Sequence, residues 1–380
     1  MIGDLFYVHQ RGVWMTVIQF VLGAASNFSA IIVGPIATNL GWRYLFHILI
    51  GFTALEVVLL FFFVPETAYN RDHRYDIDEL ADDKLAELAA TERRHAGLSS
   101  TPEKDSENDI VQVETAASRN PAIRPKKTFF QELALFSGTY SDDNLFQLFL
   151  APFAVCLNLA VLWMVIVTGG LTAFFVAQSY VMAQIFMYPP YNLTAAGVGY
   201  LSLGPFLGGL LGSIFLGALL DPVIKWCAKR NRGIYEPEYR LLGMIPSLLT
   251  GVGLFAFGYM CQNYYSYYAT ATMHGMDLFG IVCAAISASA YVIDAYREMS
   301  SEIFIMNMVF KNLLFYGFSY FVNSWTLEAG PQTVFYIFGG VAFAMTATTP
   351  VFFFWGKRYR SFWHRHNLLE KWGIRTHAEM

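Results

Sequence analysis

The stretch GPFLGGLLGSIFLGALLD, residues 204–221, carries no charge before its last residue and places Gly204, Gly208 and Gly212 four positions apart. An apolar run of about 20 residues is long enough to cross the bilayer core as a helix. Small residues at four-residue spacing allow two such helices to pack closely. The stretch therefore predicts a membrane-spanning helix with a close-packing face.

The whole chain has the composition of a multi-pass membrane protein. Of its 380 residues, 55% are hydrophobic and 14% are charged, which is too apolar for an ordinary soluble domain. Apolar segments of spanning length occur at 13–36, 43–64, 150–178, 196–219, 241–261, 277–296, 303–323 and 333–355. We therefore predict an all-α membrane protein with about eight transmembrane helices.

Lysine and arginine are distributed unevenly between the connections of these segments. Three connections contain neither residue: 179–195, 262–276 and 324–332. Both are frequent in 225–240 and after Gly356. Because basic residues concentrate on the cytoplasmic side, we expect both termini in the cytoplasm. The predicted organisation is a pair of spans in 1–64, a partly disordered cytoplasmic loop at 65–149, a six-helix bundle at 150–356 and a cytoplasmic tail at 357–380.

The predicted cytoplasmic end of the fourth segment has the features of a gate. Gly217 and Asp221 form a G-x-x-x-D pattern that is followed by Lys225 and further basic residues. An acid beside several cations can make charged hydrogen bonds in one conformation and release them in another. The alternative is a basic loop that contains an incidental acid.

Several stretches, in this order, resemble the major facilitator superfamily, and within it the fungal members of the drug:proton antiporter group. They are DLFYVHQRGVWM from Asp4, VGPIATNLGWRYLF from Val33, FFFVPETAYNR from Phe61, YPPYNLTAAGVGY from Tyr188, NRGIYEPEYRL from Asn231 and YVIDAYREMSSE from Tyr291. The resemblance spans nearly the whole chain apart from most of the loop 65–149. It implies a helical bundle that moves a small organic molecule or cation by alternating access, with coupling to protons.

The chain departs from the family pattern in two ways. The fifth family helix usually reads g-x-x-x-G-P-x-x-G-G; Gly34 and Pro35 are kept here as a helix-packing motif, but Thr38 and Asn39 replace the last two glycines. The family has twelve helices, whereas the matching stretches correspond to the fifth to the twelfth, so we expect the first four to be absent. A truncated or non-transporting remnant is therefore the alternative to a working transporter.

Glu56 lies near the middle of the second segment. An ionisable group at that depth is costly unless it faces a cavity or a partner. We interpret it as a proton carrier or as a site for a cationic substrate. The alternative is a structural glutamate that bonds to a neighbouring helix.

Polar and aromatic side chains in three segments suit a small organic substrate, because they bind flat surfaces and orient heteroatoms. The candidates for the substrate or proton pathway are Asn158, Trp163, Tyr291, Tyr316, Tyr320 and Asn323. The last three share one helical face by their spacing. For an individual aromatic residue the alternative is ordinary packing.

The remaining gate candidates lie near the end of the sixth segment and in the seventh. Asp294, Arg297 and Glu298 are close to the predicted cytoplasmic surface, and Lys311 lies several residues into the next span. Either acid could pair with Lys311; the alternative for Lys311 is that it snorkels to the interface.

No metal site, nucleotide-binding loop or nucleophilic triad is visible in the sequence, so we expect no cofactor and no enzymatic activity. A receptor or a membrane-bound enzyme is disfavoured on this ground. The expected partners are a small-molecule substrate, protons and the lipid bilayer of the plasma or vacuolar membrane. We expect no nucleic acid partner, and a monomer.

Overall fold

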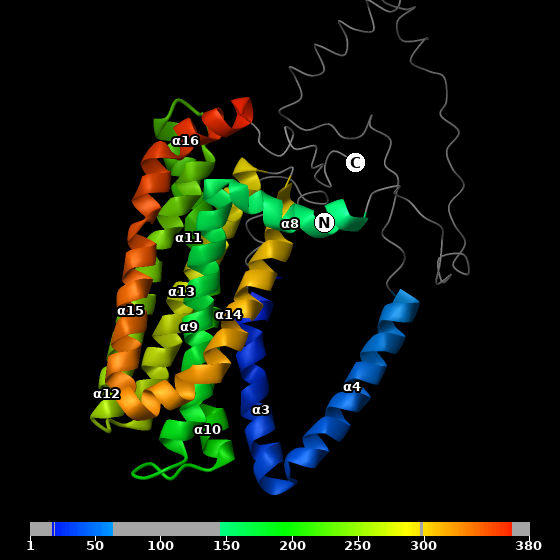
Figure 1. Ribbon diagram of the computed structural model, residues 1–380, viewed down its shortest axis with the longest axis vertical. Coiled ribbons are helices and arrows are strands. Elements are labelled where there is room, and N and C mark those ends of the chain that lie inside the picture. Colours follow the sequence, from blue (N-terminus) through cyan, green and yellow to red (C-terminus); the bar gives the residue numbers. More distant parts are fainter. Residues whose placement is uncertain (1–16, 19, 64–144, 297–298, 367–380) are drawn as a thin grey trace, which may run out of the picture. The chain divides into compact units, whose positions relative to one another are not determined.

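The computed structural model describes residues 17–18, 20–63, 145–296 and 299–366, and these are helical nearly throughout (Figure 1). Most of the predicted loop 65–149, the end of the tail 357–380, and Arg297 with Glu298 lie outside the described residues. The chain divides into two units, Met1–Leu49 with Asp143–Met380, and Ile50–Asp142.

The first unit holds most of the helices. In chain order they are η1 (Phe20–Ala25), α3 (Ser26–Asn39), α8 (Leu145–Ala154), η3 (Val155–Leu157), α9 (Leu159–Phe186), α10 (Ala195–Leu201), α11 (Leu203–Arg230), η4 (Pro237–Ser247), α12 (Leu248–Gln262), α13 (Tyr267–Ala295), α14 (Ser300–Ala329), α15 (Pro331–Ala347) and α16 (Thr349–Arg365). The helix α4 (Trp42–Phe63) crosses the boundary between the two units.

Seven helical segments of the described chain are long and apolar enough to cross a membrane, which confirms the prediction of an all-α multi-pass protein. They are Phe20–Asn39, Trp42–Phe62, Leu159–Phe186, Ala195–Arg230, Pro237–Gln262, Tyr267–Ala295 and Pro331–Arg365. The predicted span 303–323 falls within α14, which has 30 residues but is not among the seven. Polar side chains such as Asn307, Lys311 and Asn312 make α14 less apolar than its neighbours.

The predicted segment 150–178 requires correction at both ends. The helix breaks at Asn158, where the backbone is extended and the side-chain oxygen accepts a hydrogen bond of 3.0 Å from the Ala160 N–H. Asparagine is a favoured N-cap because it satisfies such an otherwise unpaired donor. From this cap α9 runs on to Phe186, eight residues beyond the predicted end.

The predicted segment 277–296 starts too late. The helix α13 begins at Tyr267, ten residues before the predicted start at Asp277, so His274 belongs to it as well. Polar residues such as His274 interrupt the apolar pattern, and a prediction from hydropathy alone therefore placed the start of the span behind them. The side chains of His274 and Asp277 are both buried, so this part of α13 is not a surface connection.

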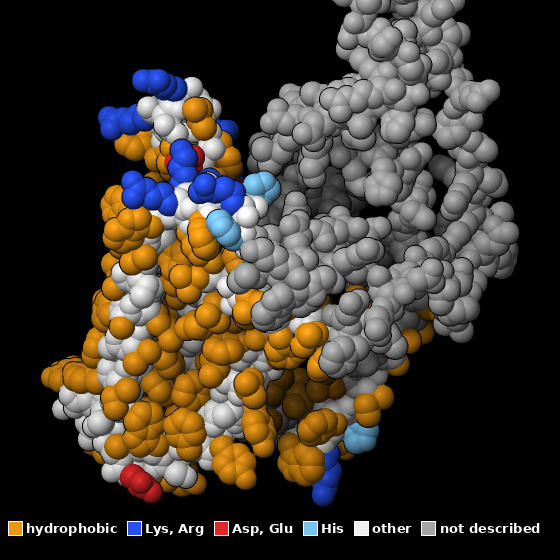
Figure 2. Space-filling view, turned by 45° about the horizontal axis from the view of Figure 1, so that its top comes forward, with side chains coloured by type: hydrophobic (Ala, Val, Ile, Leu, Met, Phe, Trp, Pro, Cys, Tyr) orange, Lys and Arg blue, Asp and Glu red, His pale blue; other side chains and the backbone are white. Residues whose placement is uncertain are grey.

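The helices α9 and α13 form the centre of the first unit. In the apolar 18-residue stretch of each of these two helices, 72% is buried. The corresponding share is 39% for the span that contains α11 and 33% for the span that contains α15 and α16. The helix α13 contacts α9, α11 and α12, and α14 and α15 pack on α9 and α12 respectively. The face of the described helices seen in Figure 2 is largely hydrophobic, which suits contact with the acyl chains of lipids.

Glycines bring the backbones of α11 and α13 together. A side-chain carbon added to α11 would lie 2.0 Å from an α13 carbonyl oxygen at Gly204, 1.9 Å at Gly208 and 2.9 Å at Gly212. Contacts this short leave no room for any side chain. The three glycines of the predicted packing motif thus lie directly against α13.

The helix α3 packs on α10 in the same way. A carbon added at Gly34, next to Pro35 in the helix, would lie 2.9 Å from the Ala195 carbonyl oxygen. The Thr38 hydroxyl, which stands where the family pattern has glycine, accepts a 3.0 Å hydrogen bond from the Ala196 N–H. The first N–H groups of a helix have no partner within the helix, so Thr38 satisfies a donor that glycine could not.

The packing of α11 on α13 predicts that a methyl group added at this contact lowers stability more than one added elsewhere. Gly208→Ala should lower stability by about 1–3 kcal/mol, because the new carbon meets the rigid Gly275 carbonyl. Gly340→Ala on α15 is the matched control, since nothing lies within 4 Å of a carbon added there. Thermal unfolding of the purified protein in detergent measures both; equal midpoints for the two variants would contradict the packing account.

Candidate functional site

Lysine and arginine side chains gather at the end of the first unit where α16 lies (Figure 2). We call this end, formed by η4, the last turns of α13 and α16, the basic end. The segment η4 packs against both α13 and α16. It is a 3-10 helix that starts with Pro237 after the extended Glu236, packs along the last turns of α13 and leads into α12.

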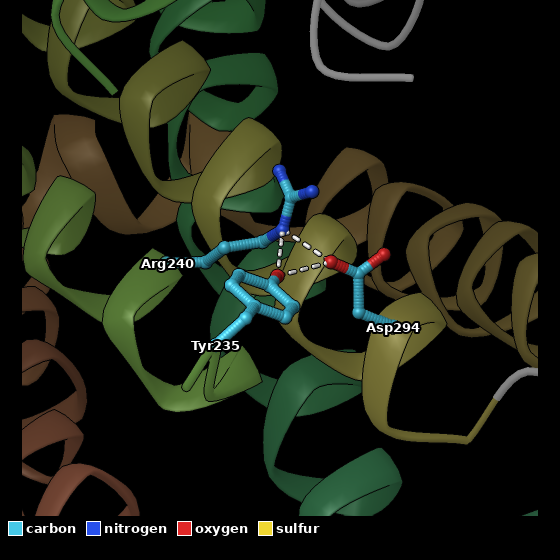
Figure 3. Close-up of polar contacts among 3 residues, drawn as sticks. All are labelled: Tyr235, Arg240 and Asp294. Carbon is cyan, nitrogen blue, oxygen red and sulfur yellow. Dashed lines mark hydrogen bonds and ion pairs between the residues drawn. The ribbon is translucent and has the colours of Figure 1, made fainter. Parts of the chain in front are cut away.

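Three side chains form a hydrogen-bonded cluster at the basic end (Figure 3). The Arg240 Nε–H donates to the Asp294 carboxylate at 2.5 Å and to the Tyr235 hydroxyl oxygen at 3.0 Å. The Tyr235 hydroxyl in turn donates to the same Asp294 oxygen at 2.5 Å. The cluster connects η4, and Tyr235 two residues before it, to the last turn of α13.

Both charges of this cluster are withdrawn from solvent. The side chains of Arg240 and Asp294 are only 5% and 8% exposed. Desolvating two charges is costly, and each then depends on the other for compensation. Burial, reinforced by the Asp294 carboxylate, raises the pKa of the Tyr235 hydroxyl, so Tyr235 remains a protonated donor at physiological pH.

Two further ion pairs connect η4 with α16. Lys357 pairs with Glu236, and Arg360 lies 3.5 Å from the buried Glu238 carboxylate. The Lys357 side chain is 66% exposed, so its pair contributes little to stability. Glu238 is buried, and its pairing with Arg360 therefore carries more weight.

An aromatic layer lies beneath these charges. The Trp163 indole donates a 2.7 Å hydrogen bond to the Thr348 hydroxyl, and its ring centroid lies 4.6 Å from Phe352 and 6.4 Å from Tyr291. The structure thus brings together two of the predicted pathway residues, Trp163 and Tyr291. Both are buried, so in this conformation they pack between α9, α13 and α16.

The other predicted pathway residues lie elsewhere. Asn158 is buried and uses its side-chain oxygen to cap α9. Tyr316 and Tyr320 are neighbours on α14 with ring centroids 6.2 Å apart, and Asn323 follows on the same helix. The two tyrosine side chains are 68% and 82% exposed. They therefore point away from the interior of the first unit.

The predicted gate residues of α11 are not part of the cluster. Asp221 is half-buried and Lys225 is exposed, and no ion pair joins either of them to another residue that the structure describes. Gly217 lies one turn before Asp221 in the same helix. The gate role of this G-x-x-x-D pattern stays a prediction.

Asp294 does carry an ion pair, but with Arg240, which sequence reasoning did not single out. Lys311 is half-buried, and its Cγ lies 3.5 Å from a carbon added at Gly169 of α9. The stretch NRGIYEPEYRL contained the missing signal, because two acids, Glu236 and Glu238, lie close to Arg240 there. What the sequence did not indicate is that this stretch folds back onto the end of α13.

Glu56 lies on α4 in the second unit, and its side chain is exposed.

The described residues include no group of three or more His, Cys, Asp or Glu side chains that could hold a metal ion. The ion pairs Arg240–Asp294, Lys357–Glu236 and Arg360–Glu238 supply the chemistry of the basic end, which is ion pairing. Such a cluster can close one end of a helical bundle and open it when the pairs separate.

The buried pair predicts a large stability difference between two single variants. Arg240→Gln should destabilise the protein by about 3–5 kcal/mol, because it leaves the Asp294 carboxylate buried without its counter-charge. Lys357→Gln, at an exposed pair, should cost less than about 1 kcal/mol. Thermal unfolding in detergent measures both variants. In the double variant Arg240→Gln with Asp294→Asn, the loss of stability should differ from the sum of the two single losses by roughly 0.5–3 kcal/mol. Strict additivity would show that the pair is not an energetic unit.

A family model and several known proteins match this chain in sequence. The family model for the Major Facilitator Superfamily matches residues 1–315 of the 380. An uncharacterized MFS-type transporter, C1271.10c of Schizosaccharomyces pombe, is 25% identical over 94% of this chain and 64% of its own length. Protein HOL1 of Saccharomyces cerevisiae is 22% identical over 98% of this chain and 69% of its own length.

A third relative, the probable drug/proton antiporter YHK8 of Saccharomyces cerevisiae, is 24% identical over 50% of this chain and 36% of its own length. The chain spans about two thirds of the length of the first two relatives. No solved structure matches it. Since the family model matches all but the last 65 residues, the chain belongs to the major facilitator superfamily.

Proposed function

We propose that the chain acts as a secondary active transporter of a small organic molecule or cation, coupled to protons, that works by alternating access. Membership of the superfamily and the transporters among its relatives support this function. In alternating access, one end of the protein closes while the other opens around a central site. A non-transporting remnant is the alternative.

The observation that carries the proposal is the cluster of Arg240, Asp294 and Tyr235 at the basic end. A buried ion pair is weak evidence for a stabilising role, because replacing it with apolar residues of similar volume is often neutral or stabilising. A buried pair that must form and separate in each cycle has a reason to be charged. We therefore assign the cluster to a gate that closes the basic end, which is the cytoplasmic end in this proposal.

The substrate side of the proposal rests on aromatic and acidic groups. The exposed Tyr316 and Tyr320 offer ring faces on α14, which suit a flat or cationic substrate. Glu56 on α4 supplies a carboxylate within an apolar helix. Trp163 and Tyr291 lie beneath the proposed gate and would contact substrate only when the gate opens.

Reconstitution tests this function directly. The purified full chain is incorporated into liposomes that contain a pH-sensitive dye, and a pH gradient is imposed. Uptake of radiolabelled spermidine and of tetraphenylphosphonium is then followed with protein-free liposomes as the control. Gradient-dependent accumulation of either probe, with matching proton movement, supports the proposal. Monodisperse protein that moves neither probe, nor any member of a wider set of labelled amines, drugs and nutrients, supports the remnant.

Glu56 provides a residue-level prediction for the same assay. Glu56→Gln should raise the KM of the transported cationic probe about tenfold, since losing one charged contact costs about 1.4 kcal/mol or more. Glu56→Asp, which keeps the charge, should restore most of the affinity. An unchanged KM for Glu56→Gln would remove Glu56 from the substrate path.

A further inference from the structure

Two ionisable side chains lie in the middle of the bundle, away from the basic end. His274 and Asp277 are three residues apart on α13 and therefore share one face of that helix. Their exposed fractions are 2% and 0%. Asp277 lies ten residues after Tyr267, about 15 Å along the helix. Both side chains are therefore enclosed by the protein.

Both side chains lack a hydrogen-bond partner within the described part of the chain. This holds for both ring nitrogens of His274 and both carboxylate oxygens of Asp277. Gln178 of α9, which is fully buried, has an unpartnered side-chain amide as well. Buried polar groups in proteins are nearly always paired, so these groups call for a ligand.

The helices close tightly around this site. The His274 ring lies between two aromatic rings, with centroids 4.6 Å from Phe175 of α9 and 6.0 Å from Phe257 of α12. A carbon added at Gly253 of α12 would lie 2.9 Å from the Asp277 backbone nitrogen. The Thr250 hydroxyl donates to the Asp277 carbonyl oxygen at 3.2 Å. The backbone is thus closely packed at the level of Asp277.

Other charges are distant from Asp277. The neighbouring helices α9, α10, α12 and η1 contain no Asp, Glu, Lys, Arg or His. On α11 the first charged residue is Asp221, nine residues beyond the contact at Gly212, and the charges of η4 belong to the basic end. The other titratable side chains of these elements and of α13 are Tyr180, Tyr200, Lys225, Cys227, Lys229, Arg230, Glu238, Tyr239, Arg240, Tyr259, Cys261, Tyr267, Tyr268, Cys283, Tyr291 and Asp294.

A proton is the ligand that this site can accept. An ionised carboxylate without a counter-charge is strongly disfavoured inside a membrane protein. A metal ion needs several oxygen or nitrogen ligands, and the described residues contain no such group. A proton needs only one base and no cavity. We propose that Asp277 is a proton-binding carboxyl group in the centre of the bundle, with His274 as the titratable side chain nearest to it along α13.

The packing links proton release to a movement of the helices. In the closed arrangement the proton is covalently bound to an Asp277 oxygen. When α9 and α12 separate from α13, water reaches this O–H group, takes the proton as hydronium and leaves a hydrated carboxylate. The helices can close again only after the carboxylate has regained a proton. This coupling step rests on the proposed transport function, whereas the proton site itself does not.

Infrared spectroscopy of the reconstituted protein tests the proton site without any substrate. A carboxylic acid has a C=O stretching band that is distinct from the bands of a carboxylate. We expect this band in the wild type at pH 7, where exposed carboxyl groups are ionised, and its loss in Asp277→Asn. Glu328→Gln, which removes an exposed carboxyl group on α14, should leave the band unchanged.

The outcomes of the infrared test are decisive. A wild type without the band at pH 7, or a band of undiminished intensity in Asp277→Asn, overturns the proposal. If Asp277→Asn does not fold, Asp277→Glu should keep the band at a shifted frequency, and an unshifted band also overturns it. His274→Gln should retain the band but move the pH at which it disappears; an unmoved midpoint removes His274 from the site.

Transport measurements separate this proposal from the proposed function. In liposomes, Asp277→Asn should still exchange labelled probe for unlabelled probe but should lose the accompanying proton movement. If the variant moves protons at the wild-type ratio, the assignment of Asp277 is wrong although transport stands. If the wild type moves no probe, transport fails while the infrared result still decides the proton site.

Discussion

The contact between α11 and α13 is the constraint on which the rest of the first unit depends. At Gly208 the two backbones are so close that no side chain fits between them. This contact holds α13 in the centre, where α9 and α12 cover its other faces. One rigid helix therefore presents Asp277 in the middle of the bundle and Asp294 at its basic end. A displacement of α13 would affect both carboxyl groups at once.

The two carboxyl groups have opposite environments. Asp294 is buried with a cation and a phenol donor, and in the proposed gate the geometry of these partners decides whether the end is closed. Asp277 is buried without any hydrogen-bond partner among the described residues, and in our proposal it gains and loses a proton. A bundle with an ion-paired carboxyl group and a proton-exchanging carboxyl group on the same helix can couple the opening of one end to protonation in its centre.

The sequence predicted those features that depend on local pattern. The spacing of Gly204, Gly208 and Gly212 predicted a close helix contact, and the apolar runs predicted the helices. Features that depend on tertiary folding were not predictable: Arg240 reaches Asp294 only because η4 packs against the last turns of α13. Hydropathy placed Asp277 at the first position of a predicted span and left His274 outside that span, so the sequence did not indicate that both side chains are buried in one helix.

The hydrogen bond between Thr38 and Ala196 joins residues that are 158 positions apart. At a synthesis rate of roughly 5–20 residues per second, α3 leaves the ribosome about 8–30 s before the residue that it will contact. During that interval Thr38 and Gly34 have no α10 to pack against and must be accommodated by lipid or by the insertion machinery. Assembly of this protein thus includes a waiting period, in which an early helix keeps a small, polar face free for a partner that is made much later.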